Sequence, residues 1–135
     1  MRYMVDTNIC IHLMQHHPPE VLERFARLQL GDVVMSVVTF AELRFGVSRL
    51  PAETGEAAQA DRALASLIED IPVLQFDERA AVSYGVLRAA VRDRQRNALD
   101  RLIAAHALAE ELTLVTNNEA DFKACPGLSL ENWVG

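Results

Sequence analysis

Four carboxylates lie where a parallel sheet would gather them. Asp6 directly follows the first expected strand, and Glu42 lies one turn into the helix after the second. Asp100 opens the helix before the fourth expected strand, and Asp121 lies just past that strand. In an open parallel sheet, functional groups collect beyond the carboxyl ends of the strands. We therefore expect these carboxylates to converge at one edge of the sheet.

Carboxylates that converge resist ionising together unless a cation offsets their repulsion. Mg²⁺ and Mn²⁺ prefer oxygen ligands and keep several of their waters. Hydrolysis of a phosphodiester is the chemistry that such an ion serves best, because the ion activates water and stabilises charge on the phosphoryl oxygens. The spacing of the acids thus favours a hydrolase that acts on phosphodiester bonds.

A structural role explains each acid equally well when it is taken singly. Asp6 is suited to cap a helix, and Asp77, after the third expected strand, is equally suited to do so. The capping-box spacing recurs at the other acids, as Thr39-x-x-Glu42, Asn97-x-x-Asp100 and Asn118-x-x-Asp121. Pattern alone therefore does not select the functional set.

Strand and helix signals alternate along the chain. Short β-rich apolar runs predict strands at 3–5, 33–36, 71–76 and 112–116, with a short last one at 128–130. Helical spacing of apolar residues predicts helices at about 7–15, 19–30, 38–49, 56–70, 78–92 and 98–110, with a loop at 51–55. This alternation is typical of an α/β layer fold with a mostly parallel sheet.

Composition restricts the class of protein. The chain has 135 residues with 13 basic and 19 acidic side chains, a formal charge of −6, and we expect a single domain over 1–135. Domains that bind nucleic acid mainly through their net charge are usually basic, so the acidic balance of this chain argues against that class. No apolar run reaches the length of a membrane span, no signal peptide opens the chain, and Cys10 and Cys125 lack a metal-site spacing. The cytoplasm is the expected location.

Five stretches carry the motif pattern of a known family. They are Tyr3 to Ile11, Val37 to Gly46, Asp100 to Ala107, Leu114 to Phe122, and Pro126 to Trp133. In this order and spacing they resemble the VapC-type toxins of the PIN-domain ribonuclease family. The residues from Asp6 to Cys10 and the ending Glu131-Asn132-Trp133 most resemble those of the branch that cleaves initiator tRNA.

The resemblance implies a three-layer α/β/α PIN-like domain with a four- to five-stranded sheet. It also implies a magnesium-dependent endoribonuclease, with Mn²⁺ able to substitute, that serves as the toxin of a type II toxin-antitoxin pair. The expected substrate is RNA, with tRNA and above all initiator tRNA as the target. The expected partners are a VapB-type antitoxin and a second copy of the chain, within a larger toxin-antitoxin complex. A catalytically inactive scaffold that binds RNA or a protein is the alternative.

The resemblance also assigns roles to residues. The catalytic acids would be Asp6, Glu42, Asp100 and the more peripheral Asp121, with Asp6 and Asp100 as metal ligands. The residues that position substrate, water or these acids would be Thr7 and Asn8 beside Asp6, Thr116 at the pocket floor, and Asn118 near a metal water or the phosphate. An aspartyl-phosphate enzyme is disfavoured, because Asp6-Thr7-Asn8 lacks a second carboxylate.

Basic residues cluster beside the third motif. Arg94 and Arg96 could form a rim that guides an RNA backbone, with a solvated helix face as the other interpretation. Family members often carry a Gly-Pro loop before the third-motif aspartate, whereas this chain has Arg94-Gln95-Arg96-Asn97-Ala98-Leu99. That departure bears on substrate choice and rate more than on nuclease chemistry.

Apolar and histidine residues complete the expectations. His106, among alanines, is expected to be packed, and His12 and His16 are expected at a surface helix end. Large apolar side chains suit a core, but the resemblance assigns part of them to an antitoxin groove and a homodimer interface. They are Phe25, Leu28, Phe40, Leu43 and Phe45.

Overall fold

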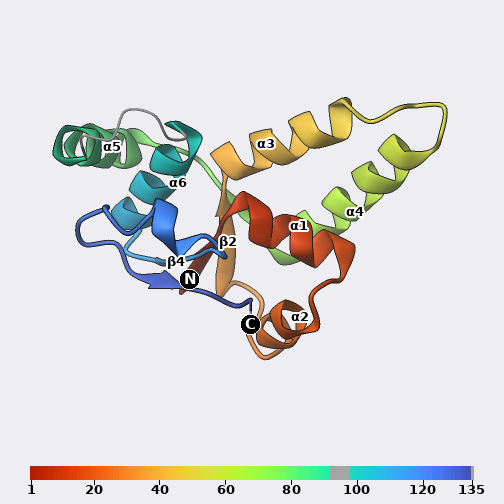
Figure 1. Ribbon diagram of the computed structural model, residues 1–135, viewed down its shortest axis with the longest axis horizontal. Coiled ribbons are helices and arrows are strands. Elements are labelled where there is room, and N and C mark those ends of the chain that lie inside the picture. Colours follow the sequence, from red (N-terminus) through yellow and green to blue (C-terminus); the bar gives the residue numbers. More distant parts are fainter. Residues whose placement is uncertain (92–97, 135) are drawn as a thin grey trace.

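Five parallel strands form one sheet at the centre of the molecule (Figure 1). The computed structural model describes residues 1–91 and 98–134. The strands are β1 (Tyr3–Val5), β2 (Val33–Ser36), β3 (Val73–Leu74), β4 (Thr113–Val115) and β5 (Leu130–Glu131), in the order β3-β2-β1-β4-β5. Each pair is parallel, so the carboxyl ends share one edge. The predicted α/β architecture is confirmed.

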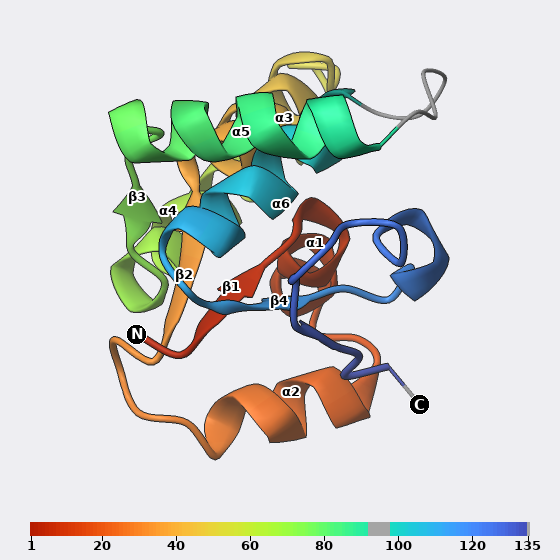
Figure 2. The same cartoon turned by 90° about the vertical axis from the view of Figure 1, so that its left-hand side faces the viewer.

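The described residues form six α-helices around the sheet. They are α1 (Thr7–Gln15), α2 (Pro19–Ala26), α3 (Val37–Ser48), α4 (Glu56–Asp70), α5 (Glu78–Ala90) and α6 (Ala98–Ala109). Figure 2 shows α5 and α6 on one side of the strands and α2 on the other, and α1 packs in the same part of the core as α2. This is the three-layer arrangement that the resemblance implies.

The alternation of side chains along the strands divides the core in two. Val5 and Val115 pack with residues of α1 to α4 in one cluster. Met4 and Leu114 point the opposite way and pack with Leu87 and the apolar side of α6 in the other. Successive strand residues face opposite sides of a sheet, so both faces are buried and the strands carry almost no polar residue.

Helices α3 and α4 form a hairpin that projects from the body of the molecule (Figure 1). Leu43 and Val47 of α3 are buried in the core, as are Leu64 and Leu67 of α4. Phe45, which the sequence suggested as core, is instead 67% exposed on the outer side of α3. The hairpin thus has one side anchored in the core, with Phe45 exposed on another side of α3.

Several element ends differ from the sequence prediction, most of all those of the third and last strands and of α2, which ends at Ala26 and not near residue 30. The third strand spans only Val73–Leu74, because Ile71 closes α4 through its amide on the Leu67 carbonyl and Asp77 already caps α5. The last strand begins at Leu130, where its register with Leu114 starts. None of the described helices is both long enough and apolar enough to cross a membrane.

Candidate active site

Asp6 lies at the junction of β1 and α1, at the carboxyl edge of the sheet. Its backbone amide donates to the Val115 carbonyl at 3.0 Å, which fixes it beside β4. Its Oδ1 accepts from the Ile9 amide at 3.0 Å, so it is the N-cap of α1. The side chain is only 5% exposed. Strand and helix together hold this carboxylate in one orientation.

The electrostatics of Asp6 show which other acids are near. Burial raises the pKa of Asp6 from 3.8 to about 6, against the hydrogen bonds from Thr116 and Ile9, which lower it. The carboxylates of Asp100 and Glu42 are smaller contributors to the same rise of the pKa. Asp100 and Glu42, both far from Asp6 in the sequence, therefore lie within electrostatic range of Asp6, as their positions at the strand ends predict. Such mutual repulsion is relieved by a cation.

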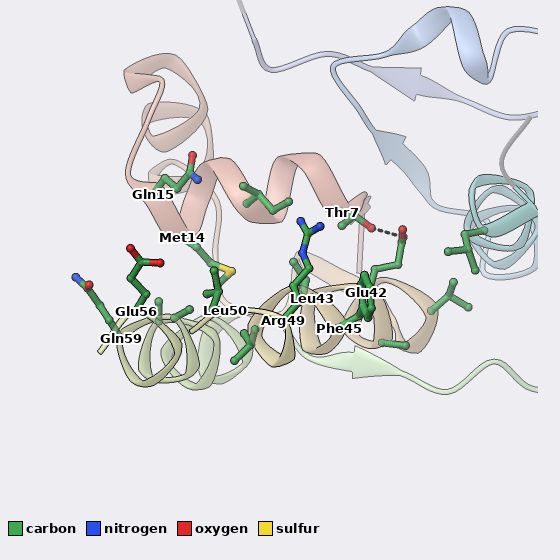
Figure 3. Close-up of a pocket in the computed structure, with 18 of the residues that line it drawn as sticks. Thr7, Met14, Gln15, Glu42, Leu43, Phe45, Arg49, Leu50, Glu56 and Gln59 are labelled. Carbon is green, nitrogen blue, oxygen red and sulfur yellow. Dashed lines mark hydrogen bonds between the residues drawn. The ribbon is translucent and has the colours of Figure 1, made fainter. Parts of the chain in front are cut away.

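Glu42 is held by Thr7, a contact that the sequence did not foresee. Thr7 Oγ1 donates to Glu42 Oε1 at 2.6 Å, across 35 residues of sequence (Figure 3). Thr7 was expected to position Asp6, but its hydroxyl is hydrogen-bonded to Glu42. Asp6 turns back to cap the Ile9 amide, whereas Thr7, at the first position of α1, faces α3. Asn8, assigned the same role, is exposed.

Thr116 connects Asp6 to the segment that follows β4. Its side chain is fully buried and hydrogen-bonds Asp6, and its Oγ1 also accepts from the Asn118 amide at 3.0 Å. The Asn118 side chain donates in turn to Asp121, in the short 3₁₀ helix η1 (Glu119–Asp121). Asp121 thus belongs to the rim of the site and is connected to Asp6 only through Asn118 and Thr116.

The donor set fits a hard divalent cation. Across residues 1–91 and 98–134, no three His, Cys, Asp or Glu side chains form a ready-made metal cage. Mg²⁺ does not need one, because it is usually held by one or two carboxylates and keeps several waters. Asp6, whose ionisation is opposed by burial and by two neighbouring carboxylates, is a suitable first ligand.

A large groove runs along the same helices. Its volume is about 1340 Å³, and it lies between α1 on one side and α3 and α4 on the other (Figure 3). Thr7 and Glu42 line the end near the acids, and Met14 and Leu50 line it further along. Most of its other lining residues are apolar as well. A mostly apolar groove therefore runs up to Glu42.

The remaining predicted residues occupy less central places. Phe25, Leu28 and Phe40 are partly buried against the core. His106 is fully buried, as predicted. Arg94 and Arg96, the proposed RNA rim, lie outside the described residues.

The profile of the PIN domain matches residues 3–128. This chain belongs to the PIN-domain family. Among PIN-domain proteins, it is 36% identical to "Ribonuclease VapC2" of Rickettsia felis over 138 residues, which cover 98% of both chains. It is also 36% identical to "tRNA(fMet)-specific endonuclease VapC" of Shigella flexneri over 136 residues, again 98% of both chains.

Solved structures of VapBC complexes share this PIN-domain fold. The VapBC2 complex of Rickettsia felis, bound to a DNA fragment from its promoter, superposes with a TM-score of 0.89. The identity is 34%, over 99% of this chain and 100% of the other. The DNA-bound VapBC of Salmonella typhimurium also has a TM-score of 0.89, at 30% identity over 99% of both chains. The VapC type of PIN domain, which the sequence motifs indicated, is thereby confirmed.

Proposed function

We propose that this chain is a metal-dependent endoribonuclease, the toxin of a type II toxin-antitoxin pair, with initiator tRNA as its target. The observation that carries the proposal is the buried Asp6, placed beside Asp100 and Glu42 with its pKa raised to about 6. Relatives of similar length are named ribonucleases and tRNA(fMet)-specific endonucleases, which supports RNA as substrate.

Asp6 and Asp100 would hold Mg²⁺, or Mn²⁺ in its place, at the edge of the sheet. When bound, the ion would activate water and stabilise charge on the phosphoryl oxygens. The chain itself supplies orientation. Thr7 occupies Oε1 of Glu42, so the remaining oxygen is left to accept a hydrogen bond from the attacking water. Thr116 fixes Asp6, Asn118 would contact a metal-bound water or the phosphate, and Asp121, which accepts from Asn118, would be the more peripheral fourth acid.

The groove beside the site is the proposed seat of a VapB-type antitoxin. An amphipathic segment that laid its apolar face along α1, α3 and α4 would run up to Glu42 and block the approach of RNA. The VapBC complexes of similar fold support this assignment. We further propose a homodimer within such a complex, following the same relationship.

The decisive experiment measures cleavage of a total tRNA pool by purified, antitoxin-free protein, with Mg²⁺ and with EDTA. Asp6→Asn and Asp100→Asn should each reduce cleavage at least about 100-fold, since even groups that only support a metal ligand contribute 10- to 100-fold. Asp77→Asn is the matched control. Asp77 caps α5 through the Ala80 amide as Asp6 caps α1, but it is exposed and outside the acid cluster.

Each outcome of this experiment has a clear meaning. Fragments that require Mg²⁺ and both aspartates, with Asp77→Asn fully active, support the nuclease, and sequencing their ends tests initiator tRNA as the target. Cleavage that survives Asp6→Asn contradicts the assigned site. If folded wild-type protein with Mg²⁺ cuts no RNA, the scaffold interpretation replaces the nuclease.

A further inference from the structure

A buried hydrogen bond joins two polar residues that the proposed chemistry does not use. Ser36 Oγ lies 2.7 Å from His106 Nδ1, across 70 residues of sequence, and both side chains are fully buried. Ser36 ends β2 and caps α3, since its Oγ also accepts from the Val38 amide at 3.1 Å. Capping needs only the serine, so the histidine makes a second, separate connection.

The elements joined by this bond are those that carry two of the acids. Ser36 stands six residues before Glu42 at the start of α3, and His106 six residues after Asp100 on α6. Six helical residues span roughly 9 Å. The bond therefore fixes the start of α3 against α6 at a similar distance along each helix from its acid. A small rotation of either helix would change the separation of Glu42 and Asp100.

The surroundings of His106 favour a neutral ring. Burial lowers the pKa of His106, and Arg79 lowers it further, against the opposing effect of Glu110, Asp77 and the Gln75 backbone. A neutral ring with an unprotonated Nδ1 accepts a hydrogen bond from the Ser36 hydroxyl, while the serine oxygen still accepts one from the Val38 amide. Both hydrogen bonds of the serine are then satisfied at once.

An apolar pair would fill the same space without this demand for polar partners. Burying a hydroxyl and an imidazole costs desolvation that their mutual hydrogen bond only partly offsets. Phe76 packs edge-on against the ring, with centroids 5.3 Å apart, which leaves the imidazole a single orientation. The Ser36–His106 pair therefore fixes the relative position of the two side chains, but it stabilises the fold less than an apolar pair of the same size would.

We propose that Ser36 and His106 are positioning residues: their hydrogen bond sets the placement of Glu42 relative to Asp100. This inference rests on the proposed nuclease function. It assigns to the pair no contact with RNA or metal, only the geometry of the two helices that carry the acids.

Two substitutions at one position separate this role from simple packing. In His106→Asn the amide lies near the place of Nδ1 and can still bond Ser36, whereas in His106→Gln it lies near the place of Nε2. His106→Gln should lower kcat for RNA cleavage about 10- to 100-fold with KM unchanged, because small misplacements of catalytic groups have effects of this size. His106→Asn should stay within about threefold of wild type, on the same reasoning.

Ile103→Val serves as the control for stability, since Ile103 is fully buried on α6 without any polar role. It should leave kcat unchanged at temperatures where the protein is folded. Ser36→Ala combined with His106→Gln should be no slower than the slower of the two single variants, as expected for one shared interaction. Equal losses in His106→Asn and His106→Gln, or additive losses in the double variant, would overturn the proposal.

A second measurement does not depend on cleavage. Titration with Mn²⁺ alone, followed calorimetrically, should show weaker binding in His106→Gln and wild-type binding in His106→Asn. If the wild type binds Mn²⁺ but cuts no RNA, the proposed function fails while the titration still tests the positioning role. If both variants bind Mn²⁺ as the wild type does, the positioning role fails by itself.

Discussion

Two carboxylates at the carboxyl ends of β1 and β5, strands that β4 separates in the sheet, lie in opposite electrostatic surroundings. Asp6, after β1, is buried beside two further acids, and its pKa is raised to about 6. Glu131, in β5, forms an ion pair with Arg24 and accepts a hydrogen bond from Trp133 Nε1 at 3.0 Å. The surroundings of Asp6 disfavour its ionised form, whereas Arg24 and Trp133 stabilise the charge on Glu131. Ionised Asp6 lowers the free energy of unfolding, so the presence of this carboxylate indicates a functional role for its charge.

The Glu131 cluster fastens the far side of the sheet. Trp133 packs edge-on against Tyr3, with ring centroids 5.6 Å apart at 74°, and the Arg24 guanidinium lies 5.8 Å from the indole centroid. The cluster thereby joins α2, β1 and the segment after β5. We interpret it as structural, in contrast to the acidic pocket, and three stability measurements test that distinction.

Trp133→Ala should have the largest effect. Trp133 is only 3% exposed, and loss of a buried aromatic ring costs about 3–5 kcal/mol of unfolding free energy. Trp133→Phe keeps a ring against Tyr3 but loses the hydrogen bond to Glu131, so about 1–2 kcal/mol should be lost. Urea denaturation measures both. An alanine variant as stable as wild type would show that the cluster does not anchor the sheet.

Asp6→Asn should act in the opposite direction and stabilise the protein at pH 7. The folded-state pKa of about 6 lies above the unfolded value of 3.8, so ionised Asp6 disfavours folding. This penalty is absent below about pH 4, grows through pH 4–6, and reaches about 3 kcal/mol above pH 6, from 1.36 kcal/mol per pKa unit. Asparagine keeps the cap on Ile9 without the charge.

The measurement is urea denaturation of wild type and Asp6→Asn at pH 4 and at pH 7.5. The variant should be more stable only at the higher pH, and added Mg²⁺ should narrow the gap by stabilising wild type. Glu131→Gln is the contrasting control and should not gain stability at pH 7.5, because Glu131 is paired. A stability difference between wild type and Asp6→Asn that is the same at both pH values would contradict the electrostatic account.

Arg24→Met should have the smallest effect. The Arg24 and Glu131 side chains are 43% and 30% exposed, and ion pairs in water contribute at most about 1 kcal/mol. Methionine keeps an apolar stem against Trp133, so only the charge is lost. The difference from wild type should shrink in 1 M NaCl, where charges are screened. A loss of stability that salt leaves unchanged would point to packing instead.

Local chemistry explains why much of the fold could be predicted from the sequence. Continuous apolar runs located the buried strands, and capping residues located the starts of some helices, among them Asp6 before α1 and Asp77 before α5. Because parallel strands end at a common edge, the positions of Asp6, Glu42 and Asp100 in the sequence were enough to expect their convergence. The motif resemblance then selected these acids from others with the same local pattern.

The contacts that sequence could not supply depend on how helices are rotated against each other. Thr7 faces Glu42 rather than Asp6 because the first turn of α1 faces α3. Phe45 is exposed because α3 presents Leu43 and Val47 to the core on its other side. Ser36 received no role in the sequence analysis, although a serine before a helix signals a cap, since its histidine partner lies 70 residues away.

The central place of β1 has a consequence for the synthesis of the chain. Tyr3 pairs with Val33 on one side but with Thr113 on the other, so the first strand to leave the ribosome waits for one of the last. Pairings so distant in sequence form slowly. Asp6 receives its Val115 and Thr116 contacts only after the segment that carries these residues has emerged. Shorter nascent chains therefore carry the acids unassembled, and the pocket forms only once β4 has been synthesised.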